Sequence, residues 1–96
     1  MRVHWTRTAI HHLVGIYEYI AQDSPRYAQR MVDKLTHRSE QIAAFPKSGR
    51  MIPEYDAPDV REVIESPYRV IYRIKRDQID ILTVVHGAQQ LPPAIA

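Results

Sequence analysis

The chain has 96 residues, 45% hydrophobic and 25% charged, and its 13 lysines and arginines against 11 acids give a formal charge of +2. This length allows one domain with one core, and the composition is ordinary for a globular protein. The absence of cysteine excludes disulfides, thiolate chemistry and cysteine-based zinc sites. No apolar run is long enough for a signal peptide or a membrane span, so we expect a cytoplasmic protein without membrane contact.

The chain begins with a predicted strand and a helix. Val3 and Trp5 alternate with polar residues, which predicts a short half-buried strand. Thr6 or Thr8 can then cap a helix that ends near Asp23. The apolar residues of this helix recur at spacings of three and four: Ile10, Leu13, Tyr17 and Ile20.

A second, longer helix follows at once. Ser24 and Pro25 form a strong start signal for a helix, because a serine side chain can accept from the free amides of the first turn. Proline has no amide hydrogen, but the amides of the first turn have no partner within the helix, so proline is tolerated there. Pro46 and Gly49 end the helix. Its predicted buried stripe comprises Ala28, Met31, Val32, Leu35, Ile42 and Phe45. The two helices should form a hairpin.

The second half of the chain has the period of strands. A loop over 50–59, with a possible short strand at 50–52, precedes predicted strands at 60–65, 68–75 and 79–86. We therefore predict an α+β fold of two layers: an N-terminal strand, a helical hairpin and then an antiparallel β-meander, with the first strand at an edge of the meander. The domain should span 1–87, followed by a frayed C-terminal tail over 88–96.

Basic residues cluster in the strand at 68–75. Arg69, Arg73 and Lys75 should project from one side with Ile71 between them, and Tyr68 and Tyr72 from the other, into the helix layer. Such a face suits an acidic protein segment or nucleic-acid phosphate, and a solvated strand edge could look the same.

The order of these elements and several short motifs resemble the ParE/RelE toxin superfamily over nearly the whole chain, from Val3 to Gly87. The motifs are Tyr19-Ile20-Ala21, Ser24-Pro25, Phe45-Pro46, Gly49-Arg50, Arg61-Glu62, the stretch Pro67 to Arg73, and Ile81-Leu82 with Val85-His86. Together they are most similar to the ParE branch.

The resemblance implies the toxin of a type II toxin–antitoxin system, a growth inhibitor neutralised by an antitoxin whose C-terminal segment wraps the helices and sheet. The ParE branch implies poisoning of DNA gyrase without nuclease chemistry, and nucleic acid is met only through the antitoxin or the target. Two alternatives stay open: a ribosome-dependent mRNA interferase of the RelE type, or a degenerate member that acts only in the autorepressing complex.

The RelE pattern of cations is mostly missing from this sequence. Its two strand lysines fall on Val60 and Glu62, only the strand arginine survives, as Arg69, and the three positions after Gly87 carry no cation. We therefore predict no catalytic residue. If the chain is a nuclease after all, Glu62, Arg69 and His86 are the set that could supply the chemistry, with the histidine as acid or base.

Binding residues are predicted from the surviving basic positions. We expect contacts with the antitoxin or target at Arg50, Arg61, Arg69, Arg73 and His86. The adjacent His11 and His12 point about 100° apart on a helix and lack further ligands at metal spacing. We therefore predict no metal and no cofactor.

Overall fold

The fold is described from a computed structural model, which places residues 1–87, 89 and 91. The elements are β1 (Arg2–Trp5), α1 (Arg7–Ala21), α2 (Pro25–Ala44), the short 3-10 helix η1 (Pro46–Ser48), β2 (Arg50–Met51), β3 (Val60–Glu65), β4 (Tyr68–Ile74) and β5 (Gln78–His86). The predicted order of strand, helical hairpin and antiparallel strands is confirmed. Neither described helix is long and apolar enough to cross a membrane.

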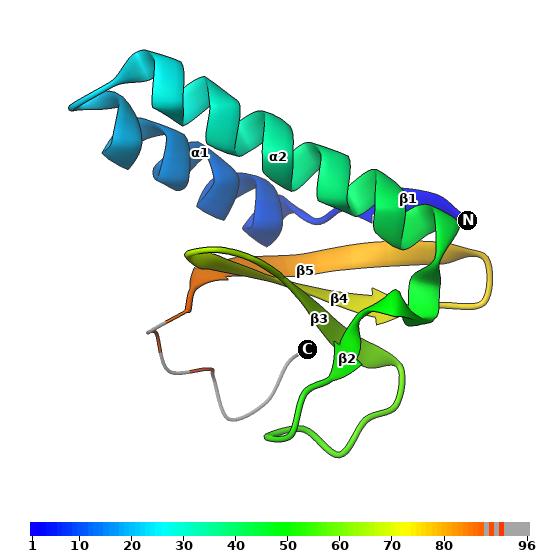
Figure 1. Ribbon diagram of the computed structural model, residues 1–96. Coiled ribbons are helices and arrows are strands. Elements are labelled where there is room, and N and C mark those ends of the chain that lie inside the picture. The colour runs from blue at the N-terminus through cyan, green and yellow to red at the C-terminus, as the bar shows by residue number, and fades with distance from the viewer. Residues whose placement is uncertain (88, 90, 92–96) are drawn as a thin grey trace.

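The five strands form one sheet in the order β1-β5-β4-β3-β2. The meander is antiparallel throughout, and β1 adds to its edge in parallel with β5. The helical hairpin lies over one face of this sheet, as Figure 1 shows. The register between β4 and β5 shifts after Ile71. Ile71 pairs with Thr83, but Tyr72 pairs with Ile81, so Leu82 has no partner on β4.

Both helices begin at the predicted caps. The Thr6 side chain accepts from the Ala9 amide, and Ser24 accepts from the Tyr27 amide with Pro25 in the first turn. Thr6 also donates to the Ile81 carbonyl at 2.7 Å, which fixes the start of α1 against β5. One side chain therefore both caps α1 and ties its first turn to β5.

The main core lies between the helices and the sheet. It contains Leu35 and Ile42 from α2, Ile16 from α1, and Tyr68 and Tyr72 from β4, so the predicted direction of both tyrosines is confirmed. Phe45 was expected in the same stripe, and this prediction is wrong. The helix ends at Ala44, and the Phe45 side chain is 70% exposed, because the chain turns into η1 before another helical position can face the core.

A second, smaller cluster covers the helix-free face of the sheet. Ile52, Val60, Ile71 and Val85 are its buried members, and Leu91 packs against them together with Tyr55, Ala57 and Leu82. The segment after β2 runs along this side (Figure 1). The prediction that the tail over 88–96 is frayed concerns a segment of which only Gln89 and Leu91 are described, and the other positions lie outside the described residues.

Candidate functional site

A carboxylate lies at the centre of the helix-free face. Glu62 on β3 stands opposite Ile71 of the second cluster, and its side chain has no exposed surface. Arg50 Nε donates to one of its oxygens at 2.6 Å, and Arg69 Nε donates to the other at 2.5 Å. The side chain of Arg69 is itself only 12% exposed, whereas that of Arg50 is 64% exposed. Each oxygen of the buried Glu62 carboxylate is therefore paired with a guanidinium group, and this pairing offsets the cost of burying the charge.

The predicted basic side of β4 exists, but acids accompany its cations. Arg69 also approaches Glu54 at 4.0 Å, and Arg73 Nε lies 3.5 Å from a carboxylate oxygen of Asp59. Lys75 Nζ donates to Asp80 at 2.7 Å. Each of the three expected cations therefore has a carboxylate within 4 Å, so an incoming anion must compete with the protein's own acids.

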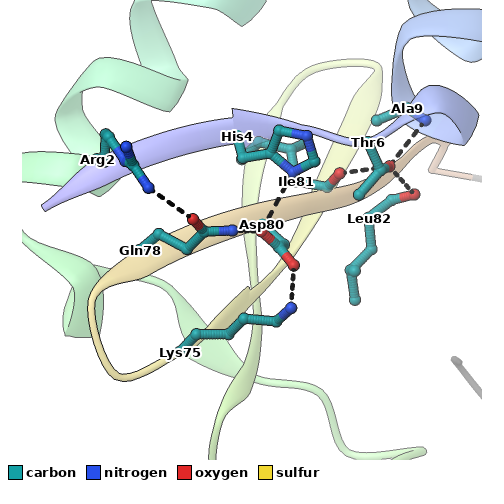
Figure 2. Close-up of polar contacts among 9 residues, drawn as sticks. All are labelled: Arg2, His4, Thr6, Ala9, Lys75, Gln78, Asp80, Ile81 and Leu82. Atoms are coloured by element: carbon teal, nitrogen blue, oxygen red, sulfur yellow. Dashed lines mark hydrogen bonds and ion pairs between the residues drawn. The ribbon is translucent and has the colours of Figure 1, made fainter.

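Asp80 joins the edge strand to the meander, as Figure 2 shows. It is buried on β5 and accepts from Lys75 and from Gln78 Nε2, while His4 Nδ1 on β1 lies 3.4 Å away. Arg2 donates to Gln78 at 3.2 Å, so the network spans β1, β5 and the end of β4. Burial alone would raise the pKa of Asp80, but the hydrogen bonds from Lys75, Gln78 and His4 outweigh it and lower the pKa.

His86 and Arg61 lie on the side of the sheet that faces the helices. His86 stands opposite Tyr68 of the main core, and the two rings meet edge to face with centroids 5.8 Å apart. Arg61 donates to the Gly49 carbonyl at 2.9 Å beside Tyr72. The structure therefore brings Glu62 and Arg69 together and places His86 on the opposite face.

A groove between α1, the start of β4 and the end of β5 was not predicted. It has a volume of about 690 Å³ and is floored by Ile16, Tyr68 and Val84. His11, His12, Tyr19 and His86 are at its rim. His12 is partly buried and shares a hydrogen bond of 2.7 Å with Thr83. The pKa of His12 is lowered, mainly by burial and to a smaller extent by the neighbouring His11. The sequence signal that could have revealed the groove is Gly15, an exposed glycine inside α1 that also lines it.

Comparison with known proteins identifies the family. A model of the ParE toxin of the type II toxin–antitoxin system parDE matches residues 3–91. The chain belongs to this ParE toxin family. Its similarity to known proteins also extends over nearly the whole chain. It is 36% identical to "Putative toxin Y4kP" of Sinorhizobium fredii, over 98% of this chain and 96% of the relative. It is also 33% identical to Toxin RelE2 of Caulobacter vibrioides, over 92% and 97% of the two chains.

A solved structure of a ParE-family system agrees with the fold. The chromosomal ParDE toxin–antitoxin system from P. aeruginosa includes a chain that superposes on this one with a TM-score of 0.73 and 27% identity, over 90% of this chain and 95% of that one. The protein is thus the toxin component of a type II toxin–antitoxin system, as the family and the relatives agree. The predicted superfamily and its ParE/RelE-like fold are confirmed.

The positions that carry cations in the RelE pattern have other environments in this ParE-family chain. Val60 is buried in the second cluster, and Glu62 has the opposite charge to the lysine it replaces. Gln89 accepts from the His86 amide at 2.6 Å. Ala88 and Gln90 lie outside the described residues. Among the described residues, no group of three or more histidines and acids could hold a metal ion.

Proposed function

We propose that this toxin inhibits growth by binding DNA gyrase in the cytoplasm and stabilising its cleaved-DNA state, so that the topoisomerase supplies all the chemistry. The observation that carries the proposal is the arrangement around Glu62. Its carboxylate is buried between Arg50 and Arg69, while His86 lies across the sheet from both. A nuclease needs its cations and its proton-transfer group around one phosphate. An arrangement that separates them supports a toxin that acts by association.

The proposed contact surface combines the arginines that remain accessible. The Arg50 side chain is far more exposed than that of Arg69, the other arginine beside Glu62, and Arg73 lies farther along the same face. Arg61 and His86 are proposed as further contacts on the opposite face, so the partner must also reach the side of the sheet that carries the helices. The same surface, with α1, is proposed to receive the cognate antitoxin, because a segment rich in carboxylates can pair with these cations in place of the protein's own acids.

The direct test is a supercoiling assay with purified gyrase, relaxed plasmid and the toxin. We expect the toxin to inhibit supercoiling and to leave linear plasmid after the reaction is stopped with detergent and protease. Arg50→Ala should weaken inhibition by roughly 2- to 10-fold, because single contacts in an interface act gradually, while Arg7→Ala on α1 serves as a control of equal charge change. Normal supercoiling at toxin concentrations that stop growth would exclude gyrase as the target.

A translation extract tests the alternative, an mRNA interferase of the RelE type; one relative is named Toxin RelE2. We expect no codon-positioned cuts by primer extension. Should cuts appear, the toxin is an interferase, and His86→Ala and Arg69→Ala should each reduce the cleavage rate by about 10²-fold or more, as the loss of an acid–base or phosphate-binding group does. Absence of any growth inhibition would instead favour the degenerate member that acts only in the autorepressing complex.

A further inference from the structure

The outer face of α2 carries a row of cations that the proposed function does not use. Residues four apart on a helix lie one above the other and form a ridge along its surface. One such ridge of α2 is basic at four successive positions, which we call the basic row: Arg26, Arg30, Lys34 and Arg38. At about 1.5 Å per residue, its charges follow one another at intervals of about 6 Å. Like charges at this spacing repel one another, so the basic row costs stability unless a partner offsets the repulsion.

Three members of the basic row lack the acids that accompany the cations of β4. Arg38, at the end of the row, lies 3.8 Å from a carboxylate oxygen of Glu65. In the part of the chain that the structure describes, no carboxylate oxygen lies within 4 Å of a charged nitrogen of Arg26, Arg30 or Lys34. All three residues are exposed. Unlike the cations of the sheet, they can therefore receive an external anion without displacing one of the protein's own acids.

The two acids of α2 lie on neighbouring ridges and have partners of their own. Asp33 accepts a hydrogen bond of 2.9 Å from the Gln29 side chain. A carboxylate oxygen of Glu40 lies 3.6 Å from His37 Nδ1. Because neither acid stands in the basic row, the row presents an unbroken line of positive charge.

The basic row offers charge and little apolar surface. The apolar side of α2 is buried in the main core through Leu35 and Ile42, so it is not available to enter a membrane. Tyr27 is an exposed aromatic residue beside the row, and the guanidinium group of Arg30 lies 5.4 Å from the centroid of its ring. This contact orients Arg30 without neutralising its charge. A rigid line of cations suits a regular line of phosphate groups better than it suits the apolar anchors of a protein interface.

We propose that the toxin binds duplex DNA directly through the basic row, with Arg26, Arg30 and Lys34 each contacting a phosphate group and without reading the bases. The major groove of B-DNA is about 12 Å wide and admits an α-helix, whereas the major groove of duplex RNA is deep and narrow. α2 lies at the outer border of the molecule, where a duplex can approach it (Figure 1). The family resemblance implied contact with nucleic acid only through the antitoxin or the target, and the basic row indicates a direct contact.

This inference goes beyond the proposed function and does not depend on it. The proposed gyrase contacts Arg50 and Arg73 lie on the helix-free face, and the basic row lies on the helical layer. A toxin that is bound to gyrase through the sheet can therefore hold DNA through α2 at the same time. The basic row is equally exposed without gyrase, so the isolated toxin is sufficient for a test.

Fluorescence anisotropy with the isolated toxin and a short labelled DNA duplex of arbitrary sequence tests the inference. Each neutralised phosphate group releases counterions, so log Kd should rise with the logarithm of the salt concentration at a slope of about 0.9 per contact. Three contacts give a slope of about 2.7, so the Kd should rise roughly 40-fold between about 50 and 200 mM KCl. Lys34→Gln removes one contact and should lower the slope by about 0.9.

Two triple variants with the same change in net charge locate the contact. One neutralises the three unpaired members of the basic row: Arg26→Gln, Arg30→Gln and Lys34→Gln. The matched control neutralises three exposed cations elsewhere that have no carboxylate within 4 Å among the described residues: Arg7→Gln, Lys47→Gln and Arg76→Gln.

The first triple variant should raise the Kd by roughly 40-fold or more at about 50 mM KCl and lose most of the salt dependence. The control should change the Kd by less than about fivefold, because salt screens charges that do not contact the DNA. Circular dichroism checks the fold of both. The Tm of the first variant should not fall, since the substitutions remove repulsion between like charges.

The outcomes separate this inference from the proposed function. Absence of DNA binding at about 50 mM KCl, or a Kd that does not change with salt, would overturn the inference. An equal loss of binding in both triple variants would show that net charge alone attracts the DNA. Tighter binding to an RNA duplex of the same sequence would overturn the choice of DNA. Inhibition of gyrase by a toxin that does not bind DNA would overturn this inference alone, and DNA binding by a toxin that does not inhibit gyrase would overturn the proposed function alone.

Discussion

The buried charge of Glu62 allows a quantitative test of what holds the helix-free face together. Glu62→Gln keeps the size of the side chain but removes its charge and replaces one acceptor oxygen with a donor. That donor must face the Nε–H of Arg50 or Arg69, which donate at 2.6 and 2.5 Å. Arg50 can turn to solvent, but Arg69 is only 12% exposed and would keep a buried charge whose remaining carboxylate contact is Glu54, at 4.0 Å.

Breaking a buried ion pair from one side costs about 3–5 kcal/mol. A domain of this length has a free energy of unfolding of roughly 5–15 kcal/mol, so the substitution should remove a large share of the total. At about 4 °C or more per kcal/mol, the Tm should fall by about 12 °C or more. Urea denaturation followed by circular dichroism measures the change directly.

Two further variants decide whether the buried charge is the cause. Glu54→Gln is the matched control, because Glu54 is 53% exposed and only approaches Arg69 at 4.0 Å, so the expected loss is below about 1 kcal/mol. Adding Arg69→Met to Glu62→Gln removes the cation that has lost its buried partner and should recover part of the lost stability. The reasoning fails if Glu62→Gln unfolds within 1 kcal/mol of the unaltered protein, or if the second substitution destabilises it further.

Two other predictions concern the ends of the sheet. The pKa of Asp80 is lowered in the folded state, so its contribution to stability is present above the pKa of the unfolded chain and is lost as pH falls through the folded pKa. Asp80→Asn should therefore flatten the decline in Tm between pH 5 and pH 3. The control Asp77→Asn, at an exposed position, should leave that decline unchanged. Gly49→Ala should destabilise the fold by about 1–3 kcal/mol, because the added methyl group collides with the Tyr72 hydroxyl and the Glu62 carbonyl; a Tm equal to that of the unaltered protein would contradict the contact.

The local features of this protein could be read from its sequence. The caps at Thr6 and Ser24, the alternation of Tyr68 to Ile74 and most of the apolar spacing of the helices depend on residues within a few positions of one another. Ile10 and Phe45 were predicted to lie in the apolar stripes, and both are exposed. Such patterns act through neighbouring turns and strand faces, so sequence alone predicted the element order and the direction of the β4 tyrosines. The resemblance to ParE/RelE toxins rested on the same segments.

The tertiary structure decided what depends on contacts between distant segments. Neither the parallel pairing of β1 with β5 nor the burial of Glu62 between arginines 12 and 7 positions away has a local signature. The groove lined by His11 and His86 has one local sign, Gly15, but its walls come from segments far apart in the sequence. A glutamate in a strand that alternates could equally have faced water. It became the centre of a buried cluster because β2 and β4 each place an arginine beside it, and only the assembled sheet brings three such strands within reach of one carboxylate.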